Sequence, residues 1–199
     1  MNVEFWNERY GGSDYFYGTE PNAFLKHVAA RISPGPVLCL AEGEGRNAAY
    51  LAGLGHTVTA IDQSALGMEK ARRLAASRGL HVDTMVTDLA AYSIEPGKWS
   101  GIIATFVHLP PRLRAEVHRQ VVAGLKMGGV YIMEAYTPAQ LAYDTGGPKD
   151  PELLMTLKAL KQELSGLEIV IGREIERDVR EGGGHTGRAA VVQVLAERK

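Results

Sequence analysis

The sequence contains a single cysteine, no surplus of either charge and no long apolar run. Cys39 on its own excludes an internal disulfide and a cysteine-based zinc site. Lys and Arg number 22 against 23 Asp and Glu, so no basic excess indicates binding to nucleic acid or to anionic lipid. No apolar stretch reaches the ~20 residues of a membrane-spanning helix. We therefore expect a cytoplasmic protein with no membrane, nucleic-acid or metal partner.

The N-terminus is polar and aromatic, which is unlike a signal peptide. A length of 199 residues is typical of one domain, and we predict a single domain over residues 1–199. Residues 1–35 stand apart as an aromatic, partly helical segment suited to act as a lid, and residues 36–199 form the core. No long exposed apolar helix face is evident, which favours a monomer.

From residue 36 onwards, strand-like and helix-like patterns alternate. Apolar strands are predicted at 37–40, 56–61, 81–88, 100–107 and 130–136. Helices are predicted at 21–32 and 46–53. A third helix is predicted to start after the N-cap residue Ser64, and a fourth to start at Pro111. Such alternation is typical of a parallel sheet with helices on both faces.

The C-terminal part ends differently. Leucines spaced from 153 to 164 predict another amphipathic helix, and strands follow at 167–177 and 189–198. The glycine-rich loop 181–188, which contains His185, is short, so the strands that it joins must pair antiparallel. The predicted fold is a three-layer α/β/α sandwich with a seven-stranded, mostly parallel sheet and one antiparallel strand near the edge.

The stretch AEGEGRN, residues 41–47, follows the first strand directly. In open α/β sheets, ligands bind beyond the carboxyl ends of the strands at this place. Gly43 and Gly45 allow a sharp turn and close approach of a ligand, and the helix from Arg46 offers free N–H groups. Glu42 and Glu44 would repel a pyrophosphate but favour a cationic ligand.

Two further acids follow the next two strands. Asp62 ends the second strand, at the place where a carboxylate can accept hydrogen bonds from a ribose diol. Asp88 ends the third strand and could accept a hydrogen bond from an exocyclic amine such as adenine N6. A glycine turn and two acids at three successive strand ends therefore indicate an adenosine-containing ligand.

These motifs resemble those of the class I S-adenosylmethionine-dependent methyltransferases, in the branch that includes the tellurite-resistance and thiopurine methyltransferases. The resemblance covers nearly the whole chain. It rests on FWNERY (5–10), YGTEPNAFL (17–25), VLCLAEGEGRN (37–47), AIDQS (60–64) and LKMGGVYIMEAY (125–136). It implies a Rossmann-like core, S-adenosyl-L-methionine as cofactor and in-line methyl transfer to a small-molecule acceptor.

The resemblance also implies the cofactor contacts. The family's glycine turn, ribose acid and adenine acid fall on Gly43, Gly45, Asp62 and Asp88. The other expected cofactor-binding residues are Trp6, Tyr17, Ala41, Glu42, Glu44, Arg46, Asn47, Gln63, Leu89 and Thr105.

Two residues depart from the family's pattern. Cys39 stands in place of its strand-one aspartate, and Ala41 in place of its first glycine. We expect Glu42 or Glu44 to take over part of the lost aspartate's role.

Methyl transfer to a neutral thioether leaving group needs mainly alignment and exclusion of water. Tyr17 and Trp6 are candidates to pack over the reacting groups. His108 and His185 are candidate general bases, because imidazole titrates near neutral pH. Tyr136 and Tyr143 are candidates for the acceptor pocket, together with the loop 137–150.

Three alternatives stay open at this point. A non-catalytic protein that binds S-adenosylmethionine would fit the altered glycine motif. A nicotinamide-dependent oxidoreductase would need G-x-G-x-x-G and a substrate domain. A nucleic-acid methyltransferase would need a basic groove. The acceptor itself could carry a soft atom such as sulfur, selenium or tellurium.

Overall fold

The computed structural model describes residues 3–143 and 145–199. Residues 1–2 of the expected lid segment and residue 144 of the expected loop 137–150 lie outside the described residues. The strands are β1 Pro36–Leu40, β2 Thr57–Asp62, β3 Asp83–Val86, β4 Trp99–Thr105, β5 Leu125–Tyr136, β6 Glu168–Glu181 and β7 His185–Glu197.

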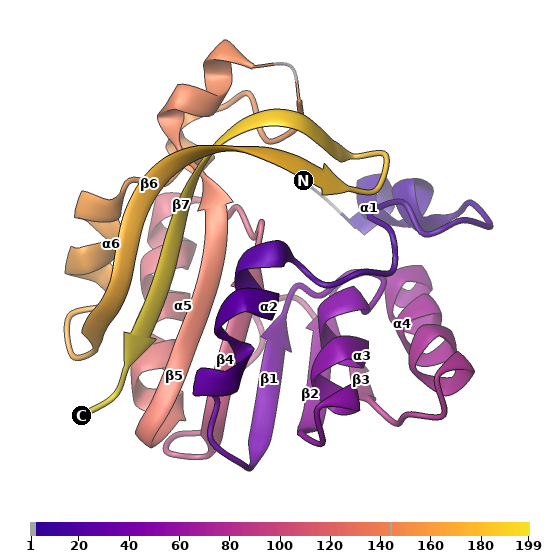
Figure 1. Ribbon diagram of the computed structural model, residues 1–199, viewed down its shortest axis with the longest axis horizontal. Helices are drawn as coiled ribbons and strands as arrows, with labels where there is room; N and C mark the ends of the chain where they lie inside the picture. The colour runs from indigo at the N-terminus through magenta and orange to yellow at the C-terminus, as the bar shows by residue number, and fades with distance from the viewer. Residues whose placement is uncertain (1–2, 144) are drawn as a thin grey trace.

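The strands form one sheet in the order β3-β2-β1-β4-β5-β7-β6 (Figure 1). All neighbours pair in parallel up to β5, whereas β7 runs antiparallel to both β5 and β6. This confirms the predicted seven-stranded sheet with one antiparallel strand next to the edge. The order reverses between β1 and β4, so the carboxyl end of β1 is the place where a ligand crevice opens.

The helices are α1 Val3–Tyr10, α2 Ala23–Val28, α3 Arg46–Gly53, α4 Ala65–Ser77, α5 Pro111–Gly124 and α6 Leu157–Glu163. Short 3₁₀ turns lie at η1 Ala29–Arg31, η2 Pro138–Ala142 and η3 Pro151–Leu153.

Two apolar clusters cover the two faces of the sheet. Val37 and Cys39 of β1 pack with α2, α3 and α4, whereas Leu38 and Leu40 pack with α5 and α6. This alternation follows from the two-residue period of a strand, and it makes β1 buried on both faces. Cys39 is a buried core residue of this layer.

The C-terminal part differs from the sequence prediction in two places. The leucines from 153 to 164 do not share one helix, because the chain is extended at Leu154 and Thr156 then caps α6. The glycine-rich loop is shorter than expected and consists of residues 182–184, because β6 ends only at Glu181 and β7 already begins at His185. His185 is therefore the first residue of a strand and is not a loop residue.

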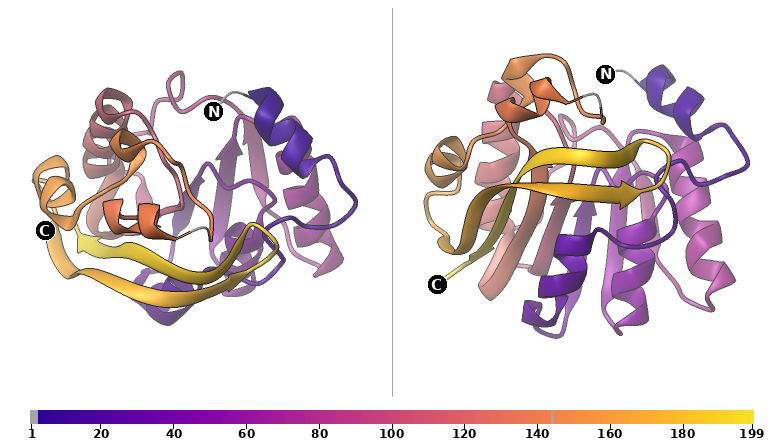
Figure 2. Two further views of the ribbon diagram at one scale, coloured as in Figure 1. Left: turned by 90° about the horizontal axis from the view of Figure 1, so that it is seen from above. Right: turned by 45° about the horizontal axis from the view of Figure 1, so that its top comes forward.

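The N-terminal segment and the β6–β7 hairpin meet above the carboxyl edge of the sheet (Figures 1 and 2). The Gly183 N–H donates to the Phe16 carbonyl at 2.9 Å. The N-terminal segment is also attached to α4, because the Ser64 hydroxyl donates to Asn7 Oδ1 at 2.6 Å and so holds α1 to the start of α4. The two segments thereby roof the crevice at the end of β1.

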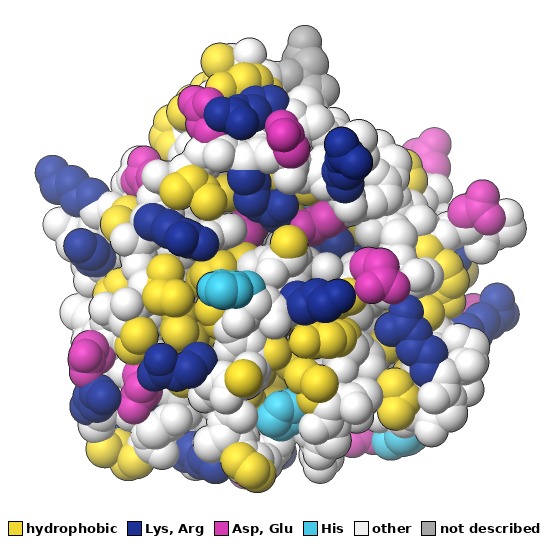
Figure 3. All heavy atoms as spheres, in the orientation of Figure 1, with side chains coloured by type: hydrophobic (Ala, Val, Ile, Leu, Met, Phe, Trp, Pro, Cys, Tyr) yellow, Lys and Arg dark blue, Asp and Glu magenta, His cyan; other side chains and the backbone are white. Residues whose placement is uncertain are grey.

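On the face shown in Figure 3, positive and negative side chains are interspersed and neither forms a continuous patch. Within residues 3–143 and 145–199, every helix is too short or too polar to span a bilayer.

Candidate active site

A cavity of about 310 Å³ lies under the roof formed by the N-terminal segment and the hairpin. The site residues predicted from the sequence line it, except Gly43, Gly45 and Tyr143. We call the part built by residues 41–47, Asp62 and Asp88 the turn end. We call the part built by Tyr17, Phe106, Tyr136 and His185 the aromatic end.

The two glycines of the turn serve the packing of the protein itself. A Cβ at Gly43 would lie 2.7 Å from Tyr10 Oη, and one at Gly45 would lie 2.5 Å from Ala71 Cβ. Both have positive φ, at 63° and 86°. Ala41, which replaces the family's first glycine, also has a positive φ of 45°. An alanine held there is strained, and such strain is characteristic of functional turns.

Asp62 organises the turn through both oxygens of its carboxylate. Oδ2 accepts from the Gly43 N–H at 2.9 Å, and Oδ1 accepts from the Ser64 N–H at 2.8 Å. The side chain is buried, and burial raises its pKa while the backbone N–H groups lower it. Each oxygen keeps a second lone pair, so the carboxylate can still accept hydrogen bonds from a ligand hydroxyl in the cavity.

Glu42 caps helix α3 from inside the turn. Its Oε1 accepts from the N–H groups of Asn47 and Ala48, each at 2.8 Å. Burial raises the pKa of this carboxyl to about 7, against the lowering effect of those N–H groups. Glu42 lines the cavity, so a cationic ligand there would favour its charged form.

Glu44 has a different task, because its carboxylate ties the roof to α4. Oε1 pairs with Lys70 Nζ at 2.8 Å, and Oε2 accepts from the Tyr17 N–H at 3.3 Å. Both oxygens are thus engaged by the protein. Of the two glutamates expected to replace the family's aspartate, Glu42 has the position that suits a ligand.

The other predicted residues of the turn end are less enclosed or support one another. Asp88 is exposed, and its Oδ1 accepts from the Ala90 N–H at 2.8 Å. Thr105 Oγ1 accepts from Asn47 Nδ2 at 2.9 Å, which joins the end of β4 to α3. Gln63 and Leu89 follow the two acids and line the same wall of the cavity.

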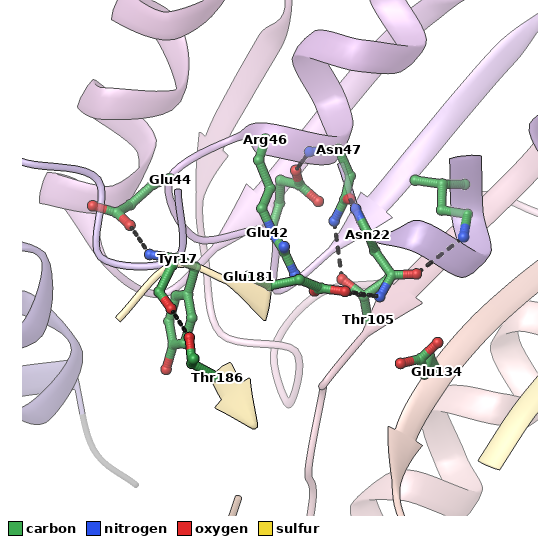
Figure 4. Close-up of polar contacts among 12 residues, drawn as sticks. Tyr17, Asn22, Glu42, Glu44, Arg46, Asn47, Thr105, Glu134, Glu181 and Thr186 are labelled. Carbon is green, nitrogen blue, oxygen red and sulfur yellow. Dashed lines mark hydrogen bonds and ion pairs between the residues drawn. The ribbon is translucent and has the colours of Figure 1, made fainter. Parts of the chain in front are cut away.

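A buried chain of charges links the turn end to the hairpin (Figure 4). Arg46 Nη2 pairs with Glu181 Oε2 at 2.6 Å. Glu181 Oε1 pairs with Arg177 at 2.8 Å, and Arg177 pairs in turn with Glu134. The other terminal nitrogen of this guanidinium, Arg46 Nη1, is buried and has no hydrogen-bond partner. Because an unpaired buried donor is costly, this atom points to an anionic or polar ligand group.

The aromatic end is a cluster of rings in mutual contact. The His185 ring centroid lies 4.3 Å from that of Phe106, 4.5 Å from Tyr17 and 5.6 Å from Tyr136. Phe106 has a positive φ of 55°. It and Ala41 are the two non-glycine residues with positive φ in the described part of the chain, and both line the cavity.

The two candidate bases have different surroundings. His108 Nδ1 lies 2.9 Å from the Leu153 carbonyl and must donate to it, so the lone pair is on Nε2, which faces the Tyr136 N–H at 3.5 Å. Burial lowers the pKa of His108 to about 4. Burial, helped by the nearby Arg46 charge, lowers the pKa of His185 to about 3. Both imidazoles are therefore neutral, and only His185 has a nitrogen, Nδ1, that is buried without a partner.

Sequence reasoning missed several cavity residues that have no local motif. Arg9 packs its guanidinium 4.9 Å from the Phe16 ring and donates to Tyr17 Oη at 2.9 Å, so it fixes the roof. Tyr143 is absent from the lining, whereas residues 146–148 of the expected loop contribute to it. The other residues that the sequence did not single out for the site are Phe5, Tyr10, Phe16, Gly18, Thr87, Val107, Leu109 and Gly184. Among residues 3–143 and 145–199, no cluster of His, Cys, Asp and Glu has the arrangement of a metal site.

The part of the chain that builds the turn end matches a model of a known protein family. Residues 37–129 match the family model described as a methyltransferase domain. A curated relative from Mycobacteroides abscessus, a 2-heptyl-1-hydroxyquinolin-4(1H)-one methyltransferase, is 33% identical over 135 residues. That match covers 65% of this chain and 60% of the relative.

Solved structures share the fold over a longer span. A protein studied for the conversion of a disulfide bond into a thioacetal group during echinomycin biosynthesis superposes with a TM-score of 0.75 at 20% identity, over 99% of this chain and 92% of that one. TehB from Haemophilus influenzae superposes with a TM-score of 0.74 at 20% identity, over 99% of this chain and 67% of that one. At this level of identity the likeness establishes the fold alone.

Proposed function

We propose that this protein is an S-adenosyl-L-methionine-dependent methyltransferase that acts on a small-molecule acceptor. The observation that carries the proposal is the turn end of the cavity. There the glycine turn, Asp62 and Asp88 stand at the ends of three neighbouring strands around one cavity, within the stretch that matches a methyltransferase domain.

The residues present suit each part of this cofactor. Asp62 would bind the ribose hydroxyls, and Asp88 with Leu89 would border the adenine. The amino-acid part would lie by Thr105 and Asn47, with its carboxylate on Arg46 Nη1, the buried donor that has no protein partner. Glu42 would balance the ammonium and sulfonium charges. A pyrophosphate in this place would face the same carboxylate, which disfavours a nicotinamide cofactor.

S-adenosylmethionine would supply a methyl group on a sulfonium. The chain's own part is then to align the acceptor and to exclude water. Tyr17 and Trp6 close the cavity from the roof. The neutral imidazoles add no positive charge that would repel the sulfonium. His185, with its low pKa, is better suited to orient a hydroxyl than to retain its proton.

For the acceptor, the aromatic lining and the quinolone named for the curated relative both favour a flat heteroaromatic compound that carries a hydroxyl. We keep a soft-atom acceptor as a second proposal, because the sequence motifs resemble those of the tellurite-resistance branch. We also retain as proposals that the protein works as a monomer and in the cytoplasm.

The test is calorimetric titration of the protein with S-adenosylmethionine and, separately, with NADH. We expect saturable binding of the former only. Asp62→Ala should weaken it about 100-fold, because a charged hydrogen-bonding group is lost. Asp62→Asn keeps one acceptor oxygen for the turn and checks that the loss is not misfolding. Asp83→Ala, at an exposed acid on β3, serves as the control and should leave binding unchanged.

The titration also separates the alternatives. Binding of NADH without S-adenosylmethionine would favour an oxidoreductase. Tight binding of S-adenosylmethionine with no methyl transfer to hydroxylated heteroaromatics, thiols or tellurite would favour a non-catalytic binding protein.

A further inference from the structure

Most of the buried side-chain polar atoms that lack a hydrogen-bond partner in the described residues belong to residues of the cavity. Within residues 3–143 and 145–199, five buried side-chain polar atoms have no hydrogen-bond partner. Three of them, Arg46 Nη1, Tyr136 Oη and His185 Nδ1, belong to residues that line the cavity. Buried polar groups are otherwise almost always paired. The three atoms therefore indicate where ligand atoms complete the structure.

Two of the three belong to Tyr136 and His185 of the aromatic end. Tyr136 is fully buried and His185 is 7% exposed. Their rings meet edge to face, with centroids 5.6 Å apart. The hydroxyl can both donate and accept, and a neutral imidazole has one donor and one acceptor nitrogen. Together they can serve one donor and one acceptor on a single ligand.

Glycine backbone packs closely against the rings that surround this pair. A Cβ at Gly146 would lie 3.1 Å from Tyr136 Oη, and one at Gly147 would lie 2.7 Å from Tyr136 Cδ2. A Cβ at Gly184 would lie 2.3 Å from Phe16 Cε1. Glycine at these positions thus lets backbone and rings approach one another without side chains between them.

Phe106 shows that the protein accepts strain to build this wall. Its positive φ is rare for a bulky residue and strains the backbone. That backbone conformation accompanies ring contacts with both Tyr136, at 4.8 Å, and His185. The charges of Arg46 and Glu181, which act most strongly on His185, are paired with each other.

We propose that Tyr136 Oη and His185 Nδ1 form a neutral hydrogen-bonding pair that selects the acceptor by its polar edge. The pair fits an uncharged flat ring that carries a hydroxyl beside or opposite a carbonyl. His185 Nδ1 accepts from the hydroxyl and Tyr136 Oη donates to the carbonyl. This inference rests on the proposed methyltransferase function and adds to it the two residues that determine acceptor specificity.

The experiment compares two ligands that differ by one hydroxyl: 2-heptyl-1-hydroxyquinolin-4(1H)-one and 2-heptylquinolin-4(1H)-one. The wild-type protein should bind the hydroxylated compound about 10-fold more tightly in fluorescence titrations, because the N1–H of the second compound is one atom shorter than the hydroxyl and leaves His185 Nδ1 without a donor at hydrogen-bond distance. His185→Phe keeps an aromatic ring but removes the acceptor nitrogen, so it should bind both compounds equally. Tyr136→Phe should weaken both about 10-fold, since both carry the carbonyl.

A stability measurement separates recognition from a structural role. Tyr136→Phe removes a hydroxyl that has no partner, so the melting temperature of the free protein should stay the same or rise. The matched control is Tyr131→Phe, since the Tyr131 hydroxyl is buried and bonded to His118. Tyr131→Phe should lower the melting temperature and leave binding of both quinolones unchanged.

Three results would overturn the inference. The first is a hydroxyl preference that survives in His185→Phe. The second is a Tyr136→Phe variant as destabilised as Tyr131→Phe. The third is binding of S-adenosylmethionine by a wild-type protein that binds neither quinolone, which would leave the proposed function standing. If S-adenosylmethionine does not bind, the proposed function fails and this inference fails with it.

Discussion

The two ends of the cavity are built on opposite principles. At the turn end, the carboxylates of Asp62, Glu42 and Glu44 are held by backbone N–H groups or by Lys70. At the aromatic end, Tyr136 and His185 leave buried polar atoms without partners. Apart from Arg46 Nη1, the turn end is thus complete as a framework before any ligand arrives. The aromatic end carries an energetic cost that only a ligand would offset, which is typical of a site shaped for recognition.

The two ends are joined by the pair Arg46–Glu181, and breaking it should have the largest effect. Glu181→Ala leaves Arg46 buried without its partner and leaves Arg177 paired with Glu134 alone. We expect a loss of about 3–5 kcal/mol in the free energy of unfolding, measured by urea denaturation. The control is Glu176→Ala on the same strand, where the pair with Arg188 is about half exposed. It should cost much less than Glu181→Ala, because solvent screens an exposed pair.

Equal losses in the two variants would mean that the buried chain contributes no more than a surface pair. The turn end and the aromatic end would then be energetically independent.

The framework character of the turn end predicts that Gly45 tolerates no side chain. In Gly45→Ala the new Cβ would meet Ala71 Cβ at 2.5 Å, in addition to the strain of φ +86°. We expect a destabilisation of about 3 kcal/mol in thermal unfolding. Gly55→Ala has a similar φ of +91° but open space around it, so it should cost only about 1–2 kcal/mol.

If Gly55→Ala is as destabilising as Gly45→Ala, backbone strain alone explains the glycine, and the close packing of the turn on α4 contributes nothing.

The same contrast explains what could be predicted from the sequence. The turn end comes from residues 41–89, where each strand end is marked by a local motif, and Asp62 and Ser64 lie as predicted. The aromatic end brings together residues 17, 106, 136 and 185, which no spacing connects. His185 was misplaced in a loop because glycines at 182–184 hide how far β6 and β7 extend. Tertiary pairing decides such boundaries, and local patterns do not reveal it.

The two ends should also differ in their response to pH. The pKa of Glu42 is raised to about 7 in the folded protein, so its charged form is disfavoured there. Stability from this group is therefore greatest below its unfolded pKa and falls as pH rises through about 7. A cationic ligand reverses the preference. We expect S-adenosylmethionine to bind about five- to tenfold more tightly at pH 8 than at pH 6, by calorimetry.

Glu42→Gln should flatten this dependence, and it also controls for ionisation of the ligand itself. His108 and His185, with pKa values near 4 and 3, contribute no transition in this range. A pH dependence that persists in Glu42→Gln would assign the titration to another group and remove Glu42 from the cofactor's surroundings.

The smallest effect is expected at Asp88, which is the least enclosed acid of the turn end. Its Oδ1 already accepts from the Ala90 N–H, so Oδ2 is the freer oxygen for an adenine amine. Asp88→Asn keeps an acceptor oxygen and should weaken S-adenosylmethionine binding about threefold, whereas Asp88→Ala should weaken it about tenfold. If Asp88→Ala weakened S-adenosylmethionine binding as much as Asp62→Ala does, Asp88 would help to organise the turn end and would not merely contact the adenine. An unchanged dissociation constant in Asp88→Ala would place the adenine away from β3, and would confine the recognition of the nucleoside to Asp62 and the glycine turn.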